Sequence, residues 1–294
     1  MAVRAETAPV VAAAPRNRAA TAAWRSLRRN RLALTGGFLV AIIAMVAMLA
    51  PLLPLNDPNR THPAARLRPP SATTALGTDQ LGRDLLSRVI WGARVSMTVG
   101  LGATAIALVV GTGTGLLAGF YGGVVDAVAM RAIDVLLAFP YILLAIALVA
   151  ILGPGLFNAM LAVAAVNVTF YARGVRSAVL LVRQSEYVEA ARAIGATPAW
   201  TLWNHVVPNI LAPVVVFASL NVGWMITETA GLSFIGLGAQ PPTADWGTML
   251  ADGRAFITVA AHMAVIPGVA IFLLVLGLNL VGDGLREALD PRLR

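Results

Sequence analysis

Long apolar stretches separated by short polar segments occupy most of this chain. Crossing the hydrocarbon core of a bilayer takes a helix of about 20 apolar residues. Charge-free stretches of at least this length cover residues 32–55, 95–125, 135–171, 206–227 and 263–282. The third is too long for one span, and Gly153-Pro154-Gly155 divides it, because proline removes a backbone donor and glycine disfavours a helix. The pattern predicts an all-α, polytopic membrane protein with six transmembrane helices.

Six spans place both termini on one side of the membrane. Fifteen of the 22 arginines then lie on that side and seven on the other, so the positive-inside rule makes both termini cytoplasmic. The organisation expected is a cytoplasmic tail (1–31), a first transmembrane helix (32–55), an extracytoplasmic segment (56–94), a core of five helices (95–284) and a second cytoplasmic tail (285–294). A polar cytoplasmic loop (182–208) lies within the core.

Composition narrows the class of protein further. The chain is 58% hydrophobic and only 12% charged, whereas soluble domains carry about 25% charged residues. It contains no cysteine, which excludes disulfides, thiolate metal sites and cysteine nucleophiles. The net charge of +8 comes from arginines that flank apolar spans, so it indicates control of topology and no nucleic-acid partner is expected.

The cytoplasmic loop carries signals for two short helices joined by a glycine. Ser185 is a candidate N-cap, Gly195 suits the left-handed position after a helix end, and Thr197 with Pro198 suits a second helix start. Small side chains are frequent here, which predicts a surface able to enter a groove on a partner. They belong to Ala190, Ala191, Ala193 and Ala196.

The same loop resembles the EAA loop of ABC-importer permeases. Its carrying residues are Glu189, Ala190, Ala191, Gly195 and Pro208, in the spacing Glu-Ala-Ala, three residues, glycine, then a hydrophobic stretch ending in proline. Valine stands where the general motif has leucine before that proline. The resemblance implies that these residues couple the membrane part to ATPase subunits. His205, in the ending His-Val-Val-Pro-Asn, is similar to the peptide and nickel branch, and we interpret it as structural.

Further segments resemble the C-type permease subunit of dipeptide, oligopeptide and nickel importers, over residues from about 24 to the C-terminus. They are Gly77-Thr78-Asp79, Gly82-Arg83-Asp84, Leu86-Ser87-Arg88, Gly92-Ala93-Arg94, Phe120-Tyr121-Gly122-Gly123, residues 228–238, Gln240-Pro241-Pro242, Trp246-Gly247, residues 282–286 and Leu289-Asp290-Pro291. The resemblance implies a type I ABC importer permease fold in the cell membrane of a prokaryote. It also implies a homologous second permease, two cytoplasmic ATPases that bind ATP-Mg, and an extracytoplasmic binding protein. No cofactor, metal site or catalytic residue is expected in this chain itself.

The two extracytoplasmic segments hold the remaining candidates. Residues 56–71 are predicted to be extended, followed by a turn and an amphipathic helix that includes Arg88. Residues 230–261 are apolar but interrupted by glycine and proline, so they are expected to lie in the interface or to re-enter the membrane as part of the outer mouth. Glu228, Ser233 and His262 are candidate outer-mouth or pathway residues.

Two patterns inside the spans concern packing. Gly111, Gly115, Gly119 and Gly123 recur every four residues and predict a glycine face that permits close helix crossing. They do not form a phosphate loop, because the Gly-Lys-Ser/Thr ending is absent. Near the start of the third span, Arg131 and Asp134 are three residues apart and are predicted to pair, with Asp126 beside them.

Rival functions and cargo stay open at this level. An intramembrane enzyme needs a nucleophile with a base or a metal cluster, and the three histidines are scattered. An autonomous ion-coupled transporter usually carries charges deep in its spans, which are nearly charge-free here. Both are less favoured than the importer permease. Dipeptides and oligopeptides are the default cargo of the branch resembled, with nickel chelates, glutathione and haem as alternatives.

Overall fold

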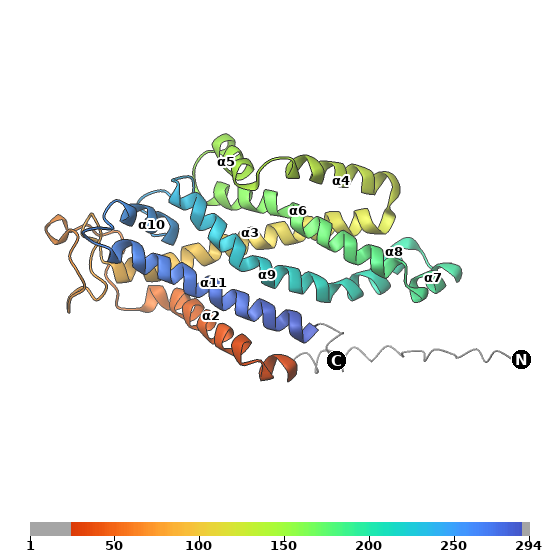
Figure 1. The fold of residues 1–294 in the computed structure, drawn as a ribbon, viewed down its shortest axis with the longest axis horizontal. Helices are drawn as coiled ribbons and strands as arrows, with labels where there is room; N and C mark the ends of the chain where they lie inside the picture. The colour runs from red at the N-terminus through yellow and green to blue at the C-terminus, as the bar shows by residue number, and fades with distance from the viewer. Residues whose placement is uncertain (1–24, 290–294) are drawn as a thin grey trace, which may run out of the picture.

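A computed structural model describes residues 25–289 as a helical bundle with no strand in that range (Figure 1). The predicted tail residues 1–24 and the last residues 290–294 lie outside the described part. The α-helices are α2 (Arg31–Leu49), α3 (Leu85–Tyr121), α4 (Gly123–Leu137), α5 (Tyr141–Leu152), α6 (Leu156–Arg183), α7 (Glu186–Ala193), α8 (Pro198–Thr201), α9 (Val207–Phe234), α10 (Trp246–Arg254) and α11 (His262–Leu289). Two 3₁₀ turns (Ala50–Leu52 and Pro63–Ala65) and a π turn (Leu202–Val206) complete them.

The bundle has two ends with different contents. Helix α10 and residues 56–84 lie at one end, named here the α10 end, and α7 and α8 lie at the opposite, α7 end (Figure 1). The start of α2 and the end of α11 both lie toward the α7 end. Five helices, counting α8 and α9 as one, are long and apolar enough to cross a membrane, and the bent pair α4–α5 brings the candidates to six.

The third predicted span is the bent one. Helices α4 and α5 meet at an angle of 93°, and Pro140 lies in the break between them. The predicted division at Gly153-Pro154-Gly155 is also present, because α5 ends at Leu152 and α6 begins at Leu156. The sequence therefore located one of the two breaks and missed the bend at the other proline.

Helices continue beyond several of the charge-free stretches. The helix predicted around Arg88 is present but is continuous with the second span: α3 begins at Leu85, where the Asp84 side chain accepts a hydrogen bond from the Ser87 amide, and runs unbroken to Tyr121. The tail predicted from residue 285 begins inside α11, which continues to Leu289. Charged residues mark where a helix leaves the lipid, but the helix itself can continue past them into the membrane interface or into contacts with protein.

Glycines bring α3 and α6 into close contact. A β-carbon added to Gly111 would lie 2.5 Å from the Tyr171 β-carbon, and one added to Gly115 would lie 2.4 Å from the Ala172 carbonyl oxygen. At Gly119 the nearest atom would be 2.9 Å away. The predicted glycine face is present at these three positions, whereas Gly123 lies beyond the end of α3 and begins α4.

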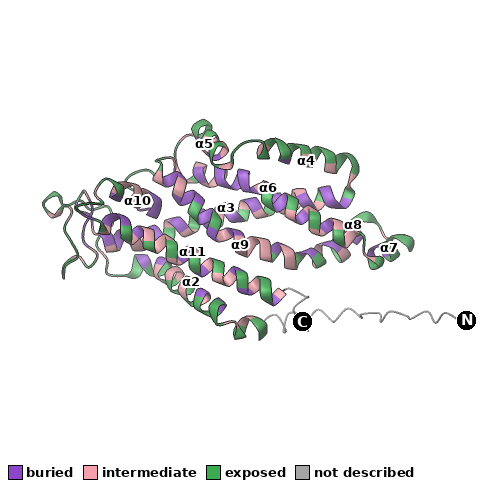
Figure 2. Ribbon diagram, viewed as in Figure 1, coloured by how far each residue is buried: buried purple, intermediate pink, exposed green. Residues whose placement is uncertain are grey.

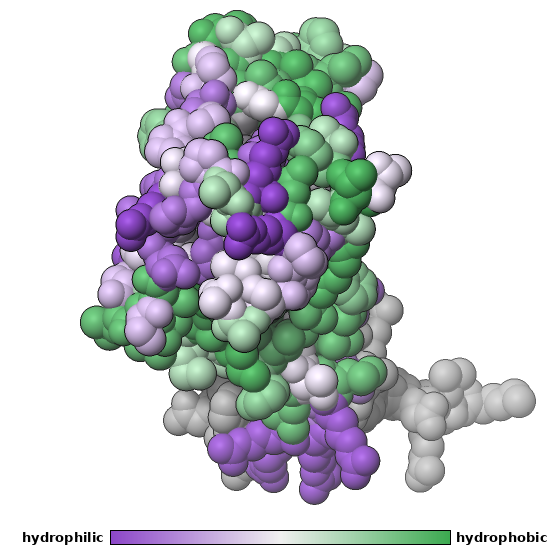
Figure 3. Space-filling model, turned by 90° about the vertical axis from the view of Figure 1, so that its left-hand side faces the viewer, coloured by the Kyte–Doolittle hydropathy of each residue, from purple (hydrophilic) through white to green (hydrophobic). Residues whose placement is uncertain are grey.

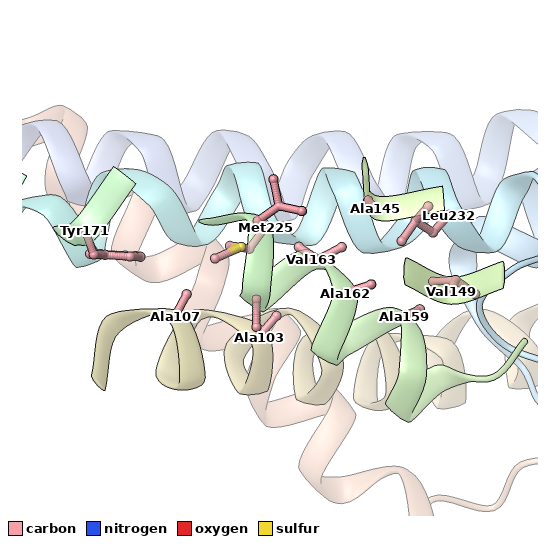
Figure 4. Packing of buried hydrophobic residues seen from close by; sticks show 12 residues of the cluster. Ala103, Ala107, Ala145, Val149, Ala159, Ala162, Val163, Tyr171, Met225 and Leu232 are labelled. Atoms are coloured by element: carbon pink, nitrogen blue, oxygen red, sulfur yellow. The ribbon is translucent and has the colours of Figure 1, made fainter. Parts of the chain in front are cut away.

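The interior is built mainly from small side chains. A buried cluster joins α3, α5, α6 and α9 through residues such as Ala103, Val149, Ala162 and Leu232 (Figure 4). Burial is concentrated where α3, α6 and α9 meet, while α4 and α7 are largely exposed (Figure 2). Helix α2 packs along α11 at the edge of the bundle (Figure 1). The large exposed apolar surface of the helices is what a lipid environment or a second membrane subunit would cover.

Candidate functional sites at the two ends of the bundle

Residues 186–208 at the α7 end, named here the α7–α8 elbow, contain two short helices joined by a turn. The backbone turns at Gly195 with φ of +85°. The Ala196 amide donates to the Ala191 carbonyl at 3.0 Å and the Gly195 amide to the Arg192 carbonyl at 3.0 Å, which is the Schellman pattern of a helix end. Within the described chain, no atom lies within 4 Å of where a Gly195 β-carbon would be. Glycine is therefore favoured here by the backbone conformation and not by crowding.

The second half of the elbow follows at once. The Thr197 hydroxyl accepts a hydrogen bond from the Trp200 amide at 3.3 Å, with Pro198 in the first turn of α8. The π turn Leu202–Val206 then joins α8 to α9, and Pro208 lies in the first turn of α9. The predicted helix, glycine turn and second helix are all present. Ser185 occupies the N-cap position of α7, although its side chain makes no capping hydrogen bond to the described residues.

One face of the elbow is held firmly by the bundle. Val188 and Ala191 are buried, and the Arg192 guanidinium lies 6.0 Å from the centre of the Phe120 ring at the end of α3. Leu202 and Val206 belong to a buried cluster that also contains residues of α3, α6 and α9. The elbow and the π turn that follows it are therefore packed against three helices of the bundle.

The other face is exposed and is more apolar than the sequence suggested. Glu189 and Ala190 are exposed, as are Ile194 at 84% and Trp200 at 48%. Of the four alanines predicted to keep one surface small, Ala190 and Ala193 are exposed, whereas Ala191 is buried. The large side chains of Ile194 and Trp200 were not predicted for this surface. The sequence signal that could have identified Ile194 and Trp200 is their apolar character within a polar loop. His205 packs between aromatic rings, 5.0 Å from Trp200 and 5.8 Å from Tyr187 between centres, which agrees with a structural role.

A buried ionic cluster ties the α10 end together. The Asp79 carboxylate accepts from Arg83 Nε at 2.5 Å and lies 3.5 Å from Arg88 Nε. All three side chains are almost fully buried. Arg88 Nη1 also donates to the Pro58 carbonyl at 3.0 Å and to the Pro242 carbonyl at 3.5 Å. The cluster therefore joins the segment 56–84, the start of α3 and the loop before α10.

Helix α10 is positioned by a second buried carboxylate. Asp245 caps α10 by accepting from the Gly247 and Thr248 amides, and it also accepts from the Ser96 hydroxyl at 2.9 Å. Burial raises the pKa of the Asp245 carboxyl, and these hydrogen bonds act in the opposite direction. The Trp246 indole donates to the Val89 carbonyl at 2.9 Å. These bonds fix α10 across the first turns of α3.

The three candidate outer-mouth residues do not converge on one site. Ser233 lines a pocket at the α10 end together with Arg83 and Arg88, but Glu228 and His262 are not among its lining residues. His262 Nε2 lies 3.3 Å from the Thr78 carbonyl, beneath the Gly77 turn. Glu228 is buried in α9, and its Oε2 has no hydrogen-bond partner among residues 25–289.

The charges of α4 pair with α6 and not with each other. Arg176 Nε and Nη2 donate to the two carboxylate oxygens of Asp126 at 2.5 and 2.6 Å. Arg173 Nη2 donates to Asp134 at 2.6 Å. The predicted pair of Arg131 with Asp134 is wrong, because an arginine on the facing helix takes the carboxylate. Two ion pairs thus hold the largely exposed α4 against α6.

Comparison with known families agrees with this architecture. Residues 111–294 match the family model described as binding-protein-dependent transport system inner membrane component. Residues 20–70 match the model described as the N-terminal TM domain of oligopeptide transport permease C.

Individual relatives match nearly the whole chain. The dipeptide transport system permease protein of Alkalihalophilus pseudofirmus is 47% identical over 92% of this chain and 90% of its own length. The glutathione transport system permease protein of Pectobacterium atrosepticum is 43% identical with the same coverage. The probable D,D-dipeptide transport system permease protein of Escherichia coli is 44% identical over 90% of this chain and 89% of its own.

A solved structure supports the fold itself. An inward-facing structure of the MetNI methionine ABC transporter has a TM-score of 0.57 at 20% identity, and covers 69% of this chain and 97% of the matched chain. At that identity the likeness is one of fold alone.

Proposed function

This chain belongs to the family of inner membrane components of binding-protein-dependent transport systems, and we propose that it forms half of the translocation pathway of an ATP-driven importer for di- and oligopeptides. Its partners in this proposal are a homologous second permease, two cytoplasmic ATPase subunits and an extracytoplasmic binding protein. The bilayer surrounds it in a prokaryotic inner membrane, with both termini and the α7 end in the cytoplasm. The excess of arginines on that side supports the orientation.

The observation that carries the proposal is the form of the α7–α8 elbow. It exposes Glu189, Ala190 and Ile194 to a partner, while Val188 and Ala191 fix it to the bundle. We assign the coupling role to the loop that contains Glu189, Ala190, Ala191, Gly195 and Pro208. A closing ATPase dimer would displace the elbow, and α3, α6 and α9 would follow because their side chains form its base. The pathway would then switch between its two open states.

The chemistry of ATP belongs to the partners in this scheme. The sequence contains no Gly-Lys-Ser/Thr ending of a phosphate loop, so ATP-Mg is assigned to the ATPase subunits and the chain acts as a non-catalytic transport subunit. Glu228, Ser233 and His262 are assigned to the outer half of the pathway, since each lies toward the end of the bundle opposite the elbow.

The cargo proposed is a small peptide. The relatives described above are named for dipeptides, D,D-dipeptides and glutathione, and all of these are short peptides with free carboxylates. This chemistry favours a peptide over nickel chelates or haem. Glutathione is the alternative cargo within the same architecture, because relatives named for it are about as similar to this chain as those named for dipeptides.

The conformation of Gly195 provides the test of coupling. Replacing it with valine forces a β-branched residue to φ of +85°, which costs about 1–3 kcal/mol of backbone strain and should abolish ATP-dependent peptide uptake into proteoliposomes that contain the complete transporter. Membrane insertion should persist, because the residue lies at the exposed end of the bundle.

The matched control is Gly195→Asn at the same position. Asparagine tolerates the left-handed region, and the open space around residue 195 within the described chain accommodates its side chain, so uptake should be retained. Wild-type uptake in the Gly195→Val variant would count against the coupling role of the elbow.

A further inference from the structure

The Gly82-Arg83-Asp84 motif lies beside a pocket at the α10 end that the coupling mechanism does not use. The pocket is lined by Arg83, Arg88, Gln80 and Asp252, with apolar walls that include Phe234 and Pro241. Figure 3 views this end of the molecule and shows hydrophilic residues from its middle to its left edge, with apolar surface above them and to their right. The pocket therefore opens at the face that receives cargo in the proposed function.

Arg83 has donors that the protein does not use. Its side chain is 6% exposed, and its Nε binds Asp79. Nη2 lies 3.7 Å from Asp252 Oδ2, which is beyond hydrogen-bond distance. Nη1 makes no hydrogen bond to any residue of the described range 25–289. Arg88, in contrast, is held by Asp79 and two carbonyl groups.

Charge at this point is incompletely balanced. Two buried guanidinium groups share the single buried carboxylate of Asp79. Asp252 offsets the second positive charge only in part, because its side chain is 43% exposed and lies at 3.7 Å. A buried and underused guanidinium favours an anion, and its planar fork matches a carboxylate. The apolar walls strengthen such an interaction by lowering the local dielectric constant.

An unused acceptor lies in the same pocket. Gln80 Oε1 is buried and has no hydrogen-bond partner in the part of the chain that the structure describes, and Gln80 lines the pocket with Arg83. A buried polar group without a partner costs free energy unless a ligand or water satisfies it. The Arg83 guanidinium can bind a carboxylate and Gln80 Oε1 can accept a hydrogen bond from an amide N–H. The C-terminal residue of a peptide carries both of these groups.

We propose that this pocket is a carboxylate-binding site, in which Arg83 receives the C-terminal carboxylate of the peptide as it enters the pathway. The inference rests on the proposed import function. The same chemistry could be supplied by an acidic side chain of the binding protein docked at this end. In either case Asp252 competes with the incoming carboxylate for Arg83.

The competition gives two variants with opposite expected effects. The assay is ATP-dependent uptake of radiolabelled dialanine into proteoliposomes that contain the complete transporter, at increasing concentrations of dialanine-loaded binding protein. Arg83→Lys keeps a positive charge but loses the fork, and it should raise the half-saturating concentration about tenfold. Asp252→Asn removes the competitor and should lower the half-saturating concentration several-fold, and the fold should tolerate it because the Asp252 side chain is 43% exposed and makes no hydrogen bond to Arg83 at 3.7 Å.

An unchanged half-saturating concentration in both variants would overturn the carboxylate site. A higher half-saturating concentration in both would also overturn it, because that is the result expected if Arg83 and Asp252 only stabilise the fold. Should Arg83→Lys fail to assemble, Asp252→Asn alone decides. Absence of uptake by the wild-type transporter would instead contradict the proposed function, which keeps the two failures distinct.

Docking of the unloaded binding protein identifies the source of the carboxylate. If the peptide supplies it, the affinity of the unloaded binding protein for the transporter in nanodiscs should be the same for wild type and Arg83→Lys. If an acidic side chain of the binding protein supplies it, Arg83→Lys should weaken docking of the unloaded form by a similar factor. Both results support a carboxylate at Arg83, and they assign it to different molecules.

Discussion

Replacing Gly115 with alanine is expected to push α3 and α6 apart at a point where their backbones are in contact. The new β-carbon would lie 2.4 Å from the Ala172 carbonyl oxygen and 3.0 Å from the Arg176 amide nitrogen. Both are backbone atoms, so no side-chain rotation relieves the contact. A carbon and an oxygen in ordinary contact are about 3.3 Å apart, and the helices must therefore separate locally by about 1 Å.

The magnitude follows from two opposing effects. Overpacking of a well-packed interior typically costs about 1–3 kcal/mol, and here Gly111 and Gly119 on the same face would lose contact as well. Alanine recovers up to about 1 kcal/mol through its higher helix propensity. Because the separation extends along the helix pair, we expect the free energy of unfolding to fall by about 1–2 kcal/mol.

Gly113 offers the matched control two residues away in the same helix. A β-carbon there would meet no atom of the described chain within 4 Å, so Gly113→Ala should leave the free energy of unfolding unchanged or raise it by up to about 1 kcal/mol. The measurement is reversible unfolding of the detergent-solubilised chain in increasing sodium dodecyl sulfate, followed by circular dichroism. Equal free energies of unfolding for the two variants would refute the interpretation that backbone contact at Gly115 sets the α3–α6 distance.

Two further experiments probe other contacts. Charge reversal by Asp126→Arg should destabilise the α4–α6 contact, and adding Arg176→Asp should restore it. A double-mutant unfolding cycle should give a coupling free energy of about 1 kcal/mol; a coupling of zero would mean that the pair does not hold α4. Gly82→Ala would place a β-carbon 1.9 Å from the His62 carbonyl oxygen at φ of +74°. The segment 56–84 should therefore loosen, and limited proteolysis should cut it faster than in wild type. In the control Gly231→Ala the β-carbon has open space within the described chain, so the same segment should be cut at the wild-type rate.

Local rules accounted for the elements that the sequence predicted well. The turn at Gly195 and the cap at Thr197 depend on residues within a few positions of each other, and the spans depend on runs of apolar residues. The bend at Pro140 was missed because its surroundings are uniformly apolar, with neither glycine nor charge to mark it. The start of α3 was missed because hydropathy reports lipid contact and not helix continuity.

Contacts between distant segments account for what the sequence did not show. Asp134 pairs with Arg173 on another helix, although Arg131 is nearer in the chain. In the folded chain, Arg88 contacts Asp79 and the carbonyls of Pro58 and Pro242. Arg83 keeps donors without a hydrogen bond, since Asp252 lies 3.7 Å away. These contacts involve separate segments and cannot be inferred from sequence spacing. The motif around Arg83 was recognised from the sequence as part of a resemblance, but its unbalanced charge is a property of the fold.

The contact between α2 and α11 has a consequence for how the chain is made in the cell. A β-carbon on Gly36 of α2 would lie 2.6 Å from the Gly277 carbonyl of α11, so the two backbones touch. The first described span to leave the ribosome therefore finds its main partner in α11, the last span that the structure describes. Until α11 has been synthesised, the surface of α2 around Gly36 lacks this partner, and a chain that stops before α11 leaves that surface uncovered by it. Contact between these two helices thus marks a chain that has been synthesised through α11, which is a feature that membrane quality control could recognise.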